Sequence, residues 1–111
     1  MQSKLFDLTG KRALITGSSQ GIGLMLAKGL ADAGAEVVIN GRDTAKLDAA
    51  SAELTALGAT VHQLPFDATD HAAVAEAVNA FETNTGAIDI LVNNAGMQHR
   101  TPLEDFDSAA V

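Results

Sequence analysis

The stretch that decides the fold is Thr16-Gly17-Ser18-Ser19-Gln20-Gly21-Ile22-Gly23. It follows residues 12–16, a short and mostly apolar run typical of a strand covered on both faces, and it opens a helical pattern over about residues 21–33. Glycines in such a turn let the backbone approach a phosphate closely, because they have no Cβ atom. The N–H groups at the helix start then receive the phosphate. The alternative is a tight strand-to-helix turn with no ligand.

The alternation of strand and helix continues along the chain. Further strands are predicted at residues 36–40, 60–64 and 88–92, and further helices at about residues 43–57 and 70–85 and from Pro102 onward. Asn40-Gly41 is in general a hairpin signal, but a helical pattern follows it here and argues against a hairpin. Crossovers of this length imply parallel strands with right-handed connections. The order βαβαβαβ therefore predicts an α/β fold, an incomplete half of a Rossmann-like doubly wound parallel sheet.

Apolar residues at helical spacing predict which side of each helix is buried. The predicted residues are Ile22, Met25, Leu26, Gly29, Leu30 and Ala33 in the first helix, Leu47, Ala50, Leu54 and Leu57 in the second, and Val74, Ala77, Val78 and Phe81 in the third. The apolar edge at residues 88–92 is expected to lack covering neighbours.

Composition narrows the function classes. The 111 residues are 47% apolar, which fits one domain with a packed core. The net charge is −7 and no Lys or Arg cluster occurs, so nucleic-acid binding is not expected. There is no cysteine, and His62, His71 and His99 are too scattered to predict a metal site. No stretch resembles a signal peptide or a membrane span, so we expect no membrane partner and a cytoplasmic protein.

The end of the second predicted strand indicates which dinucleotide is bound. In doubly wound folds an acidic residue here binds the ribose hydroxyls of NAD, whereas a nearby Arg accommodates the 2′-phosphate of NADP. Asn40-Gly41-Arg42 contains no carboxylate, and the Arg42 guanidinium suits a phosphate. The sequence therefore predicts NADP, with NAD less favoured. The alternative is a surface Arg42 paired with Asp43 or Asp48.

The glycines at 17, 21 and 23 follow G-x-x-x-G-x-G instead of the usual G-x-G-x-x-G. This loop resembles the cofactor loop of the short-chain dehydrogenase/reductase family, and Asn93-Asn94-Ala95-Gly96 is similar to the second signature of that family. Residues 6–11, Phe-Asp-Leu-Thr-Gly-Lys, are also typical of it. The resemblance covers the whole chain and implies an NAD(P)-dependent oxidoreductase. Gln20 departs from the family, since many NADP-dependent members carry a positive charge there.

The resemblance implies roles for residues at the ends of the strands. Asp67 would bind the adenine amino group and Ala68 would pack on the ring, although Asp67 could equally cap the next helix. Asn94 and its neighbours would line the ribose and nicotinamide side, although they could also be a simple turn. The predicted cofactor-binding residues are Gly17, Ser19, Gln20, Gly21, Ile22, Gly23, Arg42, Asp67, Ala68, Asn94, Ala95 and Gly96.

Within the family, residues 97–102 and the N-terminal stretch are most similar to the gluconate 5-dehydrogenases. That similarity implies a small sugar-acid or polyol substrate, with gluconate and 5-ketogluconate as the favoured pair, and a tetrameric homo-oligomer for the full-length protein. Arg100 follows the fourth predicted strand and could clamp a substrate carboxylate, or it could be a solvated loop residue.

Hydride transfer in the family depends on a Tyr and a Lys four residues apart, with a Ser and an Asn. The chain contains no Tyr, so no catalytic residue is predicted. We expect residues 1–111 to be the N-terminal portion of a single NAD(P)-binding Rossmann domain that lacks its catalytic C-terminal portion, and the chain alone to be inactive. The alternative is a stand-alone nucleotide-binding module or an inactive truncated fragment.

Overall fold

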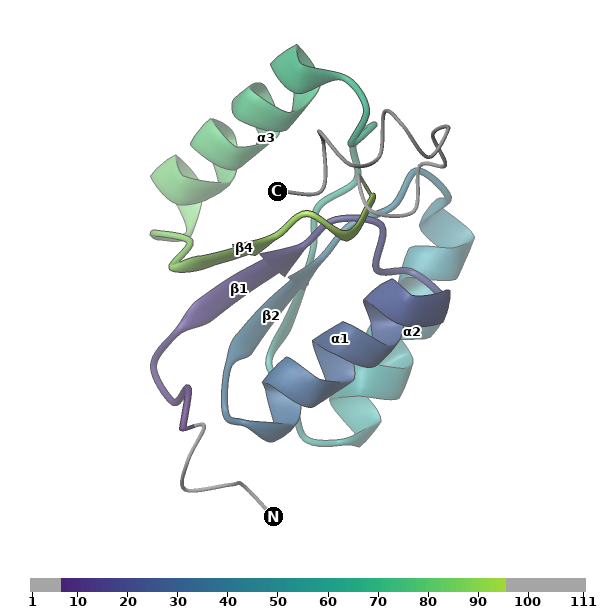
Figure 1. The fold of residues 1–111 in the computed structure, drawn as a ribbon, viewed down its shortest axis with the longest axis vertical. Coiled ribbons are helices and arrows are strands. Elements are labelled where there is room, and N and C mark those ends of the chain that lie inside the picture. The colour runs from purple at the N-terminus through teal and green to yellow at the C-terminus, as the bar shows by residue number, and fades with distance from the viewer. Residues whose placement is uncertain (1–6, 96–111) are drawn as a thin grey trace, which may run out of the picture.

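Strands and helices alternate throughout residues 7–95, the part of the chain that the computed structural model describes (Figure 1). The strands are β1 (Arg12–Ile15), β2 (Glu36–Ile39), β3 (Val61–Gln63) and β4 (Ile90–Val92). The helices are α1 (Gly21–Asp32), α2 (Thr44–Ala56) and α3 (His71–Asn84). Each element lies inside its predicted range. The helix predicted from Pro102 falls outside the described residues.

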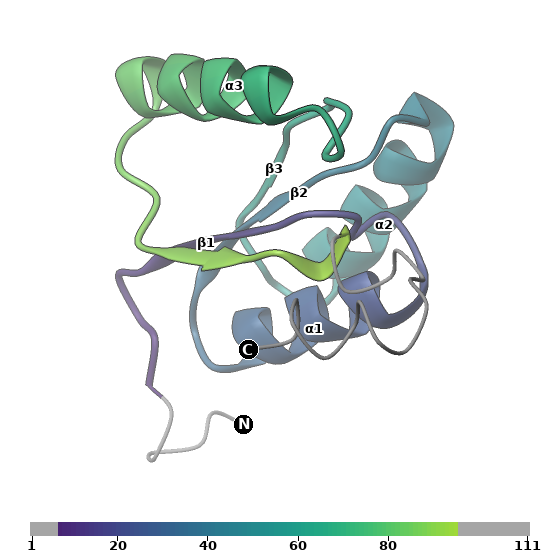
Figure 2. The same cartoon turned by 45° about the horizontal axis from the view of Figure 1, so that its top comes forward.

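The four strands form one parallel sheet in the order β3-β2-β1-β4. The helix α3 covers one face of this sheet, and α1 and α2 cover the other (Figure 2). The chain runs outward from β1 to β3 and then returns across the sheet to β4. This arrangement confirms the predicted α/β Rossmann-like fold, and it creates a switch point between the carboxyl ends of β1 and β4, where such sheets bind ligands.

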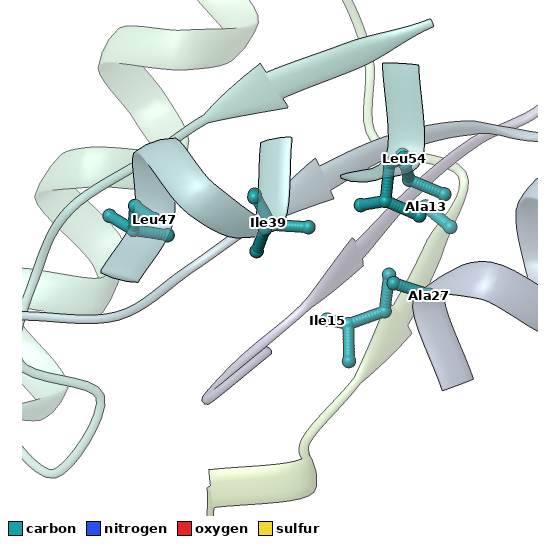
Figure 3. Packing of buried hydrophobic residues seen from close by; sticks show 8 residues of the cluster. Ala13, Ile15, Ala27, Ile39, Leu47 and Leu54 are labelled. Atoms are coloured by element: carbon teal, nitrogen blue, oxygen red, sulfur yellow. The ribbon is translucent and has the colours of Figure 1, made fainter. Parts of the chain in front are cut away.

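The larger core fills the space between the sheet and the two helices α1 and α2 (Figure 3). Alternate residues of β1, Ala13 and Ile15, point to this face, and Leu47 and Leu54 of α2 pack over the sheet beside them. The helix α1 contributes the partly buried Leu24, Leu30 and Ala31 and the fully buried Ala27. A small side chain there lets α1 lie close to the strands, which fixes where its first turn stands relative to β1.

A smaller core lies on the other face, beneath α3. Leu14 and Val38 point there from β1 and β2, and both are fully buried against Phe81 of α3. Val78 packs against the same cluster, as the spacing of α3 predicted. The register of the sheet places Leu91 of β4 beside Leu14, but the Leu91 side chain is 58% exposed.

Five of the residues predicted to be buried are exposed, and one of them is Gly29 of α1. Ile22, Met25 and Leu26 of α1 are 62%, 70% and 38% exposed, so the predicted face of this helix was partly wrong. Apolar residues lie on more than one side of α1, and the helix packs on the core through the buried Ala27 and the partly buried Leu24, Leu30 and Ala31. Leu57 is 66% exposed because α2 ends at Ala56 and Leu57 is its C-cap.

A polar cluster ties the strands together at their amino ends. The Arg12 Nε atom donates to Glu36 Oε2 at 2.6 Å, and the His62 Nε2 atom lies 2.6 Å from the same oxygen. The Arg12 guanidinium also donates to the Ala87 carbonyl at 2.9 Å and lies 5.9 Å from the centre of the Phe81 ring. The hydrogen bond from Arg12, and then the contact with His62, lower the pKa of Glu36.

The lowered pKa of Glu36 predicts an acid-sensitive contribution to stability. The charged form is favoured in the folded state, so this contribution is present at neutral pH and is lost as the pH falls through the folded-state pKa. We expect the free energy of unfolding to fall more steeply between about pH 5 and about pH 3 in the wild type than in Glu36→Gln. Urea unfolding at several pH values measures both slopes. Equal slopes would contradict the prediction.

Candidate cofactor-binding site

The predicted phosphate loop leaves β1 at the carboxyl edge of the sheet and ends where α1 begins. Both Gly17 and Gly21 have φ angles of +61°, a left-handed conformation that side chains disfavour. A Cβ atom on Gly21 would meet nothing within 4 Å, so open space lies in front of the first turn of α1. A Cβ atom on Gly17 would instead lie 3.3 Å from the Cβ of Ala95. One side of the loop is therefore packed and the other is open.

Gly23 brings the helix against the loop. A Cβ atom at this position would stand 2.2 Å from the Gly17 carbonyl oxygen and 2.6 Å from Asn94 Nδ2. Gly23 is buried, whereas Gln20 and Ile22 on either side of Gly21 are exposed. The third glycine of the motif therefore sets the close approach between helix and loop, and the exposed residues face the open side.

The start of α1 differs from the starts of the other two helices. Asp43 caps α2 by accepting hydrogen bonds from Ala45 N and Lys46 N, and Asp70 caps α3 in the same way. The N-cap residue of α1 is Gln20, whose side chain makes no capping hydrogen bond, and the first turn of α1 contains no acidic residue. The positive end of this helix is therefore not neutralised by a side chain, which suits an anion placed there.

Asn40, at the end of β2, is a functional residue that the sequence reasoning missed. Its side chain is 1% exposed and its Oδ1 atom accepts a hydrogen bond from Gly17 N at 2.9 Å. Its Nδ2 atom donates to the carbonyls of Leu64 at 3.0 Å and Phe66 at 3.1 Å. One feature of the sequence could have revealed it, namely a polar residue at the end of an otherwise apolar strand. A buried amide needs hydrogen-bond partners, and here the neighbouring loops supply them.

The segment after β4 holds the loop from the other side. Asn94 is 1% exposed, and its Nδ2 atom donates to the Gly17 carbonyl at 3.1 Å. The Thr16 hydroxyl accepts a hydrogen bond from Ala95 N at 3.0 Å. The structure thus brings Asn94 and Ala95 to the phosphate loop. Thr16 and the buried Ser18 lie in the predicted loop, but they are not among the predicted cofactor-binding residues.

Arg42 and Asp67 meet at the ends of β2 and β3. The Arg42 Nη1 atom lies 3.5 Å from Asp67 Oδ2, and the Arg42 side chain is 77% exposed. The ion-pair partners suggested for Arg42 by the sequence were Asp43 and Asp48. The observed partner is instead Asp67, another predicted site residue. The ion pair places a cation beside the residue expected to bind adenine.

Asp67 is oriented by the next polar residue of its own loop. Its Oδ1 atom accepts hydrogen bonds from Thr69 Oγ1 at 2.6 Å and from Thr69 N at 2.9 Å. These bonds, from the side chain first, lower the pKa of Asp67. The alternative that Asp67 caps α3 was wrong, because Asp70 is the N-cap residue. Ala68 follows Asp67 in the same half-buried turn.

The remaining predicted residues divide into two groups. Ser19 lies beside the start of the loop after β2, where a Cβ atom on Gly41 would stand 2.9 Å from the Ser19 hydroxyl. Gly96 and Arg100 lie outside the described residues. Within residues 7–95 no three His, Asp or Glu side chains gather as a metal site would require, and no helix there is long and apolar enough to cross a membrane.

A hollow of about 360 Å³ lies at the opposite edge of the sheet, near the amino ends of β1 and β2. Its lining includes Gly10, Lys11, Gly34 and Thr60, none of which belongs to the loop or to the carboxyl ends of the strands. The carboxyl edge has the start of α1, which no side chain caps, and none of the residues that line the hollow belongs to a helix start. We therefore place the functional site there and not in the hollow.

Comparison with known proteins gives matches over most of the chain. Residues 11–111 match the family described as short chain dehydrogenase. A gluconate 5-dehydrogenase of Gluconobacter oxydans (strain 621H) is 56% identical over 102 residues, which are 92% of this chain and 40% of that protein. A 5-keto-D-gluconate 5-reductase of Escherichia coli (strain K12) is 43% identical over 102 residues, with the same two coverages of 92% and 40%.

A solved structure also matches this chain. It is a gluconate 5-dehydrogenase from Burkholderia cenocepacia J2315 in complex with NADP and tartrate, 50% identical, with a TM-score of 0.77. The match covers 95% of this chain and 41% of that protein. The chain therefore spans about two fifths of the length of the proteins that it resembles.

Proposed function

Because this chain belongs to the short-chain dehydrogenase family, we propose that it is the NADP-binding part of an oxidoreductase that interconverts a hydroxyl and a ketone on a sugar acid or polyol. The observation that carries the proposal is the phosphate loop between β1 and α1. Its left-handed glycines leave open space in front of a helix start that no side chain caps. The residues present therefore fit a dinucleotide pyrophosphate.

Each part of the site would hold a different part of the cofactor. The loop from Gly17 to Gly23 would bind the pyrophosphate through its N–H groups, and Arg42 would bind the 2′-phosphate. Asp67 and Ala68 would hold the adenine, and Asn94 to Gly96 would line the nicotinamide side. When bound, NADP supplies or accepts the hydride. The described residues themselves bind and orient, and no proton transfer is assigned to them.

The substrate class and assembly rest on similarity. The relatives are named for gluconate and 5-keto-D-gluconate, and the solved neighbour holds tartrate, a dicarboxylate. We therefore propose gluconate and 5-ketogluconate as the favoured pair, with Arg100 as the carboxylate ligand, within a tetrameric full-length enzyme. Residues 1–111 would then be the cofactor-binding portion of its single Rossmann domain and inactive alone, since the sequence contains no Tyr. The second candidate is a nucleotide-binding module.

Replacing Arg42 tests the NADP assignment. We expect Arg42→Ala to raise the Kd for NADP about tenfold or more, because a charge-assisted contact with the 2′-phosphate is lost, and to change the Kd for NAD by less than about threefold. Lys46→Ala is the matched control, since it removes a nearby exposed cation of α2. Isothermal titration calorimetry measures all six constants, two for each of the three proteins. Wild-type protein that binds neither dinucleotide would overturn the proposed function.

The reaction itself is tested by absorbance of NADPH. We expect the 111-residue chain to bind NADP without oxidising gluconate, and a protein that joins this chain to a catalytic portion to oxidise it. Turnover by the 111-residue chain would show that catalytic groups lie within it. Binding of NADP without any activity in the longer protein would favour the nucleotide-binding module.

A further inference from the structure

We infer that Asn40 is a positioning residue that fixes the phosphate loop relative to the adenine-binding side of the site. This inference rests on the proposed binding of a dinucleotide. Asn40 ends β2, the strand between β1 and β3, and its side chain contacts the segments that follow both neighbours.

On the β1 side, Asn40 forms three hydrogen bonds with the loop. Its Oδ1 atom accepts from Gly17 N at 2.9 Å, its backbone carbonyl accepts from Ser18 N at 2.8 Å, and its backbone N–H donates to Ser18 Oγ at 2.9 Å. The Ser18 hydroxyl in turn donates to the Ile15 carbonyl at 2.6 Å. The start of the loop is therefore hydrogen-bonded to the end of β2 as well as to its own strand.

On the β3 side, the same amide holds the segment that leads to Asp67. Its two donor hydrogens serve the carbonyls of Leu64 and Phe66, at 3.0 and 3.1 Å. Phe66 immediately precedes Asp67, the residue paired with Arg42. A shift of this segment would therefore move the proposed adenine ligand relative to the phosphate loop.

An asparagine is the residue type that these partners require. Its side chain offers an oxygen acceptor and two N–H donors, and this site uses both kinds of group. Aspartate would keep the acceptor for Gly17 but turn a carboxylate oxygen toward two carbonyl oxygens. Alanine would leave one N–H group and two carbonyls without this partner, in a place where the side chain is 1% exposed.

The affinity for a dinucleotide depends on this arrangement, because the dinucleotide contacts both segments. If the two segments shift independently, only a fraction of molecules holds them at the separation that NADP requires, and the apparent Kd rises by the inverse of that fraction. Adenosine 2′-phosphate lacks the pyrophosphate, so it engages Arg42 and Asp67 but not the phosphate loop. Its affinity is expected to be much less sensitive to Asn40.

The test compares the two ligands by calorimetry in wild type, Asn40→Ala and a stability control. We expect Asn40→Ala to raise the Kd for NADP about tenfold and the Kd for adenosine 2′-phosphate by less than about threefold. Leu54→Ala, which opens a core cavity away from the site, should change both constants by the same factor. An equal loss of both ligands in Asn40→Ala would overturn the inference, because it would indicate destabilisation alone.

Amide hydrogen exchange measured by NMR gives a second readout that needs no ligand. In Asn40→Ala we expect faster exchange at Gly17 N and in residues 66–68, whereas Asn40→Asp should keep Gly17 protected and free only the second segment. Unchanged exchange at both segments in Asn40→Ala would overturn the inference. If wild-type protein fails to bind NADP, the proposed function fails, and the exchange data alone decide whether Asn40 joins the two segments.

Discussion

Replacing Gly23 with alanine is expected to destabilise the folded chain by at least about 3 kcal/mol. The new Cβ atom would stand 2.2 Å from the Gly17 carbonyl oxygen and 2.9 Å from the Gly17 carbonyl carbon. Both are backbone atoms of a loop that is hydrogen-bonded on two sides, so they cannot move away as a flexible side chain would. Urea unfolding followed by circular dichroism measures the change, and NADP binding should be lost with it.

Gly29→Ala is the matched control for Gly23→Ala, because both glycines lie in α1. A Cβ atom on Gly29 would meet nothing within 4 Å, and the residue is exposed. Alanine there should stabilise the chain by about 0.5 to 1 kcal/mol through its higher helix propensity. Equal effects of the two substitutions would show that backbone entropy, and not the contact with the loop, explains Gly23.

Leu14→Ala is expected to lower the free energy of unfolding by about 2 to 5 kcal/mol. Leu14 is fully buried between the sheet and α3, where Val38 and Phe81 close around it. Truncation to alanine would leave a cavity in this smaller core. Chemical denaturation of the purified variant measures this loss.

Leu91→Ala provides the comparison for Leu14→Ala. The two leucines are register partners on β1 and β4, but Leu91 is 58% exposed and Leu14 is fully buried. In the 111-residue chain we expect Leu91→Ala to change the free energy of unfolding by no more than about 0.5 kcal/mol. A large loss from Leu91→Ala would mean that this face of β4 is covered in solution.

The fold was largely predictable because its strands are short apolar runs separated by well-marked helices. Asp43 was a plausible cap for the second helix, and Thr69 or Asp70 for the third, and the structure has Asp43 and Asp70 as the caps. The face of α1 was harder to predict, because large apolar side chains lie on more than one side of it. Ile22 and Met25 are exposed there while Ala27 is buried. Periodicity alone does not decide between these sides, and in the fold α1 meets the core through Leu24, Ala27 and Leu30.

The site was predictable only where the residue type itself indicates a conformation or a ligand. The glycines and Arg42 could be assigned because left-handed turns and phosphates require them. The sequence did not predict the hydrogen bonds of Asn40 to its two neighbouring segments. These bonds join residues that are 23 to 26 positions apart and that meet only when the strands align. The partner of Arg42 was missed for the same reason, since Asp67 lies on a different strand end.

The two-sided attachment of Gly17 has an evolutionary consequence. Its N–H group is bound by Asn40 and its carbonyl by Asn94, so a substitution at either asparagine alters the same turn and requires compensation nearby. Arg42 is under no such constraint, since its exposed side chain makes one long ion pair with Asp67. We expect lineages descended from such a protein to exchange one dinucleotide for the other by mutation at position 42, with the phosphate loop left intact.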